Sequence, residues 1–414
     1  MAPKARSTCL EVRRTARTAS GQKRVKTAET RGIVSAGAHY LDNTANSVGQ
    51  DSKFRPDFRR ERWELRGLLW HETRLPRLAS CGRWAITPSG RVQARKTGKA
   101  VGYAGLASCG SVHVCPVCNS KIMAVRRIEV GLVLAAFPAA AFGAYTSRHQ
   151  LGDSLDGLWR NNSLLWRKVA QNRAVKEARA DLGHAGIIRA AEVTYGAFGW
   201  HPHLHPVHLF DREISQAYVD QLHQVQFQAW RSAAENLGLD APSSRAQALG
   251  LVRDGAEIDR YLTKSTYHGA NSVAWEMTST QTKSSVRAGG LTPWEIGRAV
   301  MLGDADALDL WHEWETASKG KRALTYSRGL RAAAGLDAEA TDEEIAAAEI
   351  GSEIDAGFEI VDWSPFSANP GWGADLLGVI GKKGFSAGIQ WCLDRKIEIE
   401  DCDPIGARAH TVRD

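Results

Sequence analysis

The chain lacks any uninterrupted apolar run of the ~20 residues that a helix needs to span a bilayer. Its longest apolar stretch, residues 130–145, is broken by Gly131, Pro138 and Gly143. The basic N-terminal segment lacks the apolar core of a signal peptide. No Gly-x-x-x-x-Gly-Lys-Ser/Thr run marks an ATP-binding loop, and no internal repeat is present. These absences argue against a membrane protein and predict a cytoplasmic one.

Cysteine is also scarce, with seven in 414 residues, but three of them crowd into the segment CGSVHVCPVC. An odd number with this spacing fits metal binding better than a disulfide framework. Cys109, Cys115 and Cys118 leave one tetrahedral ligand to find. Cys81, in its own Cys-Gly turn, is the first candidate, and His113 is the substitute. The sequence therefore predicts a structural Zn²⁺ site with no open coordination position.

The bulk composition is that of an ordinary globular protein, with 43% hydrophobic and 24% charged residues. A length of 414 residues allows two or three domains. The formal net charge is +7 and the isoelectric point is about 9.0, which favours a polyanionic partner without requiring one.

The central part of the chain alternates between strand and helix patterns. A strand ends at Tyr145-Thr146, and a helix follows that Asp153 or Ser154 can cap. A hairpin then runs through GIIRAAEVTYG and HPHLHPVHLF, a long helix spans roughly residues 213–237, and LGLVR is a strand. This β-α-β-β-α-β order predicts an α+β fold, an antiparallel ferredoxin-like sheet with helices on one face.

Two histidines on the second hairpin strand are the first candidate metal ligands. Side chains alternate along a strand, so His203 and His205 share one face, whereas His208 has the other parity. Glu192, on the partner strand, can complete a set of two imidazoles and a carboxylate. Such a set suits Mg²⁺ or Mn²⁺ acting as a Lewis acid on a phosphate. The alternative is a histidine-rich surface strand, because His-x-His alone is a weak signal.

A tyrosine follows on the helical segment GAEIDRYLTKS. Glu257 lies one turn before Tyr261 on the same helical face, and Lys264 lies one turn after it. The lysine can favour phenolate, the tyrosine can attack a phosphodiester, and the glutamate can activate water in a second step. The alternative is structural: Asp254 to Glu257 matches a capping box, and tyrosine at helical spacing more often packs than reacts.

In this order the motifs resemble the replication initiators of small bacterial rolling-circle plasmids, within the HUH endonucleases, most closely the branch from high-GC Gram-positive bacteria. The matching segments are CGSVHVCPVC, AYTSRHQLGD, EVTYG with GWHPHLH, and ExxxYLTK, across about residues 80–330. The resemblance implies that His203 and His205 bind the metal, with Glu192 as a third ligand. It also implies that Tyr261 nicks DNA and that Glu257 is the base that ends a replication cycle.

The expected organisation has four parts. These are a basic flexible arm (1–57), a zinc-binding region (58–135), an HUH nicking and ligation domain (136–332) and a mainly helical accessory region (333–414). The expected partners are plasmid origin DNA and the host helicase and polymerase, with no membrane. Two other classes fit the same features. A single-tyrosine HUH transposase would join element ends, and a non-enzymatic zinc-dependent DNA-binding regulator would form no covalent adduct.

Overall fold

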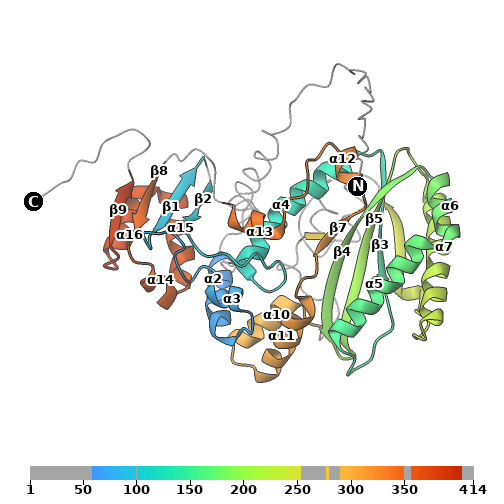
Figure 1. Cartoon of the computed structure of the whole chain (residues 1–414), viewed down its shortest axis with the longest axis horizontal. Helices are drawn as coiled ribbons and strands as arrows, with labels where there is room; N and C mark the ends of the chain where they lie inside the picture. Colours follow the sequence, from blue (N-terminus) through green and yellow to red (C-terminus); the bar gives the residue numbers. More distant parts are fainter. Residues whose placement is uncertain (1–57, 99, 253–276, 279–289, 349–355, 403–414) are drawn as a thin grey trace, which may run out of the picture.

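The computed structural model describes residues 58–98, 100–252, 277–278, 290–348 and 356–402. Within these residues, two antiparallel sheets lie toward opposite ends of the molecule with helices between them (Figure 1). The mixture of helices and antiparallel strands confirms the α+β class. None of the helices in these ranges is both long and apolar enough to cross a membrane. The predicted basic arm lies outside the described residues.

The larger sheet carries the predicted hairpin. Its strand order is β6-β3-β5-β4-β7, and every pair is antiparallel. The strands are β3 (Ala139–Thr146), β4 (His184–Gly196), β5 (Gly199–Phe210), β6 (Ala248–Val252) and β7 (Leu324–Tyr326). Helices separate β3 from β4 and β5 from β6, so the predicted β-α-β-β-α-β order is confirmed, and the order of the first four strands is ferredoxin-like.

Three helices cover one face of this sheet (Figure 1): α5 (Leu155–Gln171), α6 (Arg173–Asp181) and α7 (Gln216–Asn236). Of the two caps that the sequence allowed, the Ser154 hydroxyl caps α5 by accepting a hydrogen bond from the Gly157 amide at 3.3 Å. Tyr145 and Leu204, from the two central strands, pack with Trp230 of α7 in a shared apolar core. A short 3-10 turn, Ser244–Ala246, leads from α7 into β6.

The opposite face of the sheet is also covered. The last turns of α4 (Pro116–Ala135) place Val130 and Val133 against Ile188, Val207 and Leu209 of the sheet. The prediction of helices on one face is therefore incomplete. Helix α4 starts in the cysteine-rich segment, so it runs from that segment to the face that carries the candidate metal ligands.

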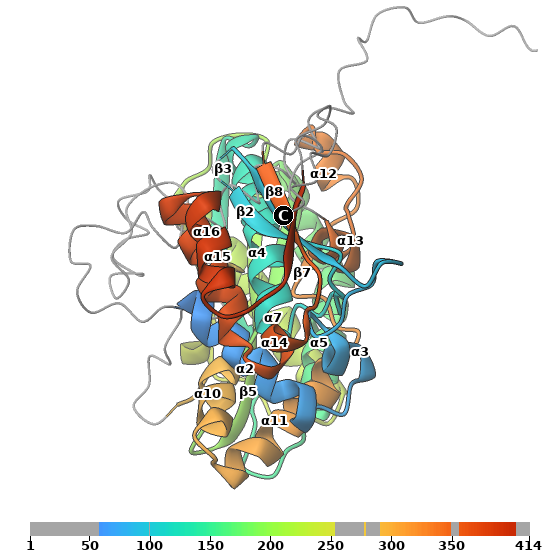
Figure 2. The same ribbon diagram turned by 90° about the vertical axis from the view of Figure 1, so that its left-hand side faces the viewer.

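The second sheet joins two distant parts of the chain, in the order β2-β1-β8-β9. Its strands are β1 (Val92–Thr97), β2 (Ala100–Ala104), β8 (Ala356–Ile360) and β9 (Ile399–Cys402). Helices α2 (Phe58–Glu72), α14 (Ser364–Ala368), α15 (Gly371–Lys383) and α16 (Phe385–Leu393) accompany it, with α15 and α16 toward the viewer in Figure 2. The expected mainly helical accessory region thus also supplies two strands, and one of them, β8, pairs with β1 of the predicted zinc-binding region.

The remaining helices fill the space between the sheets: α3 (Pro76–Ser80), α10 (Pro293–Met301), α11 (Ala305–Ser318), α12 (Leu330–Ala333) and α13 (Asp342–Ala347). A buried ion-pair network ties α13 and α12 to α4. Arg126 bonds to Glu129 at 2.9 Å and to Asp342 at 3.0 Å, and Arg331 bonds to Glu129 at 3.0 Å. The side chains of Arg126 and Glu129 are only 6% and 5% exposed.

Candidate functional site

The β4–β5 hairpin sets the candidate ligands on one face. Glu192 is directly opposite His203, and Ala190 is opposite His205, so all these side chains share a side of the sheet. Leu204 points the other way, into the core with α5 and α7. His208 also lies on that other face, fully buried and 3.1 Å from His184. The predicted sidedness of the histidines is confirmed.

His205 is held in one orientation by three neighbours. Its Nδ1 lies 3.2 Å from the Gly143 carbonyl oxygen, and its ring stacks on Phe142 with an interplanar angle of 6°. Metal-binding histidines usually donate one ring N–H to such a carbonyl, which leaves the other nitrogen as the ligand. That other nitrogen, Nε2, is 3.1 Å from Glu192 Oε2.

The spacing of this pair suits a divalent cation. Two ligand atoms that each lie ~2.1 Å from Mg²⁺ and subtend a right angle are roughly 3.0 Å apart. The observed separation of 3.1 Å matches that arrangement. The potential ligand atoms of Glu192, His203 and His205 are nonetheless not all within 4.8 Å of one another. The hairpin therefore aligns one carboxylate and one imidazole closely, with His203 on the same face.

Two further histidines extend the row beyond the predicted pair. The ring of His201 lies 4.0 Å from that of His203, and the ring of His149 stacks on His201 at 4.4 Å. His201 was detectable in the sequence, because it has the same parity as His203 and His205. His149 follows β3 and reaches the row only through the fold, so no local pattern marked it.

The predicted nucleophile, Tyr261, lies outside the described residues. So do the predicted base Glu257 and the predicted cation Lys264. The described chain stops at Val252 and is described again at Met277. The Met277 side chain is 4% exposed and lines the same cavity as Glu192 and His205.

That cavity has a volume of about 40 Å³ and lies beside the ligand pair. Its polar lining residues are Glu192, His205, His113, Asn119 and Thr292. Burial lowers the pKa of His113 to about 4, so its ring is neutral at pH 7. The cavity therefore joins the hairpin, the cysteine-rich loop and the start of α10.

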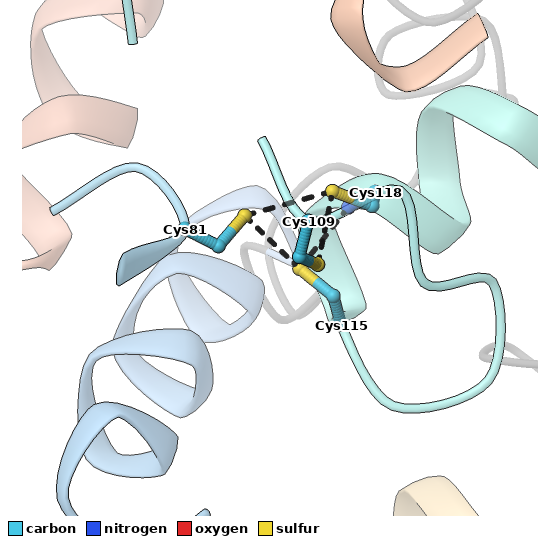
Figure 3. Close-up of side chains that lie close together, drawn as sticks. All are labelled: Cys81, Cys109, Cys115 and Cys118. Carbon is cyan, nitrogen blue, oxygen red and sulfur yellow. Dashed lines mark hydrogen bonds between the residues drawn. The ribbon is translucent and has the colours of Figure 1, made fainter. Parts of the chain in front are cut away.

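The four predicted cysteines form a compact buried quartet (Figure 3). Cys81 Sγ lies 3.7 Å from Cys115 Sγ and 3.6 Å from Cys118 Sγ, and Cys109 Sγ lies 3.6 Å from Cys118 Sγ. All four sulfurs are within 4.8 Å of one another. The structure therefore places Cys81, rather than the alternative His113, with the other three cysteines.

These distances fit a tetrahedral thiolate site. Four sulfurs bound at ~2.3 Å around Zn²⁺ are separated by roughly 3.8 Å, whereas a disulfide needs ~2.05 Å. Backbone amides also face the sulfurs: Cys118 N donates to Cys115 Sγ, and Ser111 N to Cys109 Sγ, each at 3.4 Å. Among the described residues, the quartet is the one group of three or more histidine, cysteine, aspartate or glutamate side chains whose potential ligand atoms all lie within 4.8 Å of one another.

A comparison with known proteins finds a relative whose name agrees with the resemblance that the motifs indicated. Over 328 residues the chain is 26% identical to a protein named "Protein rep" from Streptomyces lividans, which covers 62% of this chain and 71% of the relative. The chain is thus similar to a Rep protein by name. The resemblance that the motifs indicated is thereby confirmed.

A second relative carries a different name. Over 251 residues the chain is 26% identical to a "Neomycin resistance protein" from Streptomyces cyanogenus, which covers 51% of this chain and 54% of that protein. The chain thus spans about half the length of this second relative. No protein-family model and no solved structure matches the chain.

Proposed function

We propose that this chain is a plasmid replication protein that nicks one DNA strand at an origin. The observation that carries the proposal is the pair formed by His205 and Glu192, 3.1 Å apart, with His203 on the same face of the hairpin. The relative named "Protein rep" supports the biological setting, and the net charge of +7 suits a polyanionic partner.

In this proposal, His203, His205 and Glu192 hold Mg²⁺ or Mn²⁺. The ion supplies Lewis-acid polarisation of the scissile phosphate. The Gly143 carbonyl fixes the tautomer of His205, and Phe142 fixes the plane of its ring. A ligand held this way loses little freedom on binding, so the sheet preorganises the site.

The covalent chemistry is assigned to Tyr261. Its phenol oxygen bonds to phosphorus as the bond to the 3′ oxygen breaks, which leaves a 5′-phosphotyrosyl link and a free 3′-OH. Lys264 favours the phenolate, because a nearby cation lowers the cost of ionising a phenol. Glu257 activates water for the hydrolysis that ends a replication round. Energy stored in the phosphotyrosyl link makes ATP unnecessary for resealing.

The cysteine quartet takes a structural role in this scheme. We propose that Cys81, Cys109, Cys115 and Cys118 bind Zn²⁺ and join the turn after α3 to the start of α4. Four thiolates leave no open position for a substrate. The proposed partners are origin DNA, which must expose a single-stranded nick site, and the host helicase and polymerase that extend the 3′-OH.

A nicking assay tests the proposal. Supercoiled plasmid that carries the chain's own gene and flanking DNA is incubated with the protein and Mn²⁺, and denaturing gels are probed for protein on a 5′ end. We expect an adduct that EDTA abolishes and that Tyr261→Phe abolishes, with Tyr267→Phe as the matched control. An adduct retained in Tyr261→Phe would move the nucleophile elsewhere. Specific DNA binding without an adduct would favour a zinc-dependent regulator, and joining of element ends would favour a transposase.

A further inference from the structure

The loop between the second and third cysteines of the quartet reaches the hairpin site. His113, midway along this loop, lines the cavity that Glu192 and His205 also line. The ring is packed edge-on by Trp159 at 5.6 Å and by Trp314 at 5.5 Å. Trp314 Nε1 also donates a hydrogen bond to the His113 carbonyl oxygen at 3.1 Å. Both the ring and the backbone of His113 are therefore held by their surroundings.

One atom of this ring has no partner. His113 is only 9% exposed, and its Nε2 atom is buried and makes no hydrogen bond. A buried polar atom without a partner destabilises the folded state, so such atoms are usually satisfied by a neighbouring group or an ordered water. The adjoining cavity of about 40 Å³ exceeds the 10–15 Å³ that one water needs.

We propose that His113 is a positioning residue for Glu192, acting through water held in this cavity. The inference rests on the proposed function, because Glu192 is there a ligand of the catalytic metal. A buried water makes about three hydrogen bonds, and the three polar residues His113, Glu192 and Thr292 all line the cavity. Partners of ligating carboxylates typically change metal affinity 10–100-fold when removed.

The consequence is a link between the two metal sites. His113 stands two residues before Cys115 and four after Cys109, so the quartet determines where the loop lies. The cysteine loop then forms part of the nicking site and also stabilises the fold. Occupancy of the quartet would set the affinity of the hairpin for its divalent cation.

The test measures Mn²⁺ binding to the full chain by electron paramagnetic resonance, with zinc content and melting temperature recorded for each variant. We expect His113→Phe to raise the Mn²⁺ dissociation constant about tenfold or more. His113→Gln restores much of the affinity, because its amide can again bond the water. The matched control is His208→Gln, which changes a buried histidine that also has an unpartnered Nε2 but lies on the opposite face of the sheet.

A second variant protects the test against loss of the cysteine loop. Ala323, the residue just before β7, lines the cavity and is 8% exposed. The larger side chain in Ala323→Leu fills the cavity and displaces the water, while His113 and the quartet stay unchanged. We expect the same weakening of Mn²⁺ binding.

Unchanged Mn²⁺ affinity in His113→Phe, at native zinc content and melting temperature, overturns the inference. If His113→Phe loses zinc, Ala323→Leu decides by the same criterion. If the wild-type chain binds no Mn²⁺ and forms no DNA adduct, the result contradicts the proposed function itself. A wild type that does both, beside indifferent variants, removes only the role of His113.

Discussion

Replacement of a single cysteine of the quartet is predicted to cost the chain much of its stability. Cys115 is fully buried, and its sulfur lies 3.7 Å from that of Cys81, at the spacing expected around Zn²⁺. Cys392 of α16 is an equally buried thiol, outside the quartet, in the apolar core beside the smaller sheet. Cys115→Ala and Cys392→Ala therefore make the same chemical change, with and without loss of a proposed zinc ligand.

The expected magnitudes differ widely. Removing one buried sulfur costs on the order of 1 kcal/mol through lost burial. Structural Zn²⁺ contributes an apparent ~10–16 kcal/mol in zinc-finger peptides, against a total of about 5–15 kcal/mol for a folded protein. A loss of even ~5 kcal/mol lowers the melting temperature by about 10–20 °C in a domain of 150–250 residues, and ~1 kcal/mol lowers it by about 2–4 °C.

The assay combines metal analysis with thermal unfolding. Wild type and Cys392→Ala are expected to carry one Zn²⁺ per chain, and Cys115→Ala none, with a melting temperature at least 10 °C lower. A chelator should bring the wild type down to the level of Cys115→Ala. Equal melting temperatures for the two variants, or a purified wild type free of zinc, would refute the reasoning.

Three further predictions follow from other contacts. Glu192→Gln should weaken Mn²⁺ binding about tenfold or more, with little change in melting temperature, because a neutral amide replaces the carboxylate beside His205; equal affinity by titration would count against the site. Burial lowers the pKa of His184 from 6.5 to about 3, so its contribution to stability is present above pH 6.5 and is lost as the pH falls. Burial also lowers the pKa of the neighbouring His208, so part of the pH dependence remains in His184→Asn. In urea unfolding between pH 6.5 and 5, His184→Asn should lose about 2 kcal/mol less than the wild type, and an equal loss in both would contradict this reasoning. Arg126→Leu leaves Glu129 with one buried partner fewer and should cost ~3–5 kcal/mol in the same assay, whereas a loss under 1 kcal/mol would contradict the buried network.

Several features of this protein were predictable because they depend on local periodicity. Alternation along a strand places His203 and His205 on one face regardless of what packs around them. The hairpin turn brings Glu192 onto that face, and Ser154 caps its helix through a side chain three residues from its partner. Three cysteines within ten residues likewise predict a shared site.

Contacts between distant segments were decided only by the tertiary structure. Cys81 rather than His113 joins the quartet because the turn after α3 packs against the start of α4. His149 reaches His201 from the segment after β3, and β8 pairs with β1, which lies about 260 residues earlier in the chain. Such contacts depend on which apolar faces are buried together and on the cost of closing long loops, and neither leaves a periodic trace in the sequence. The sequence by itself therefore determined which residues can serve as ligands, and the tertiary structure decided which of them meet.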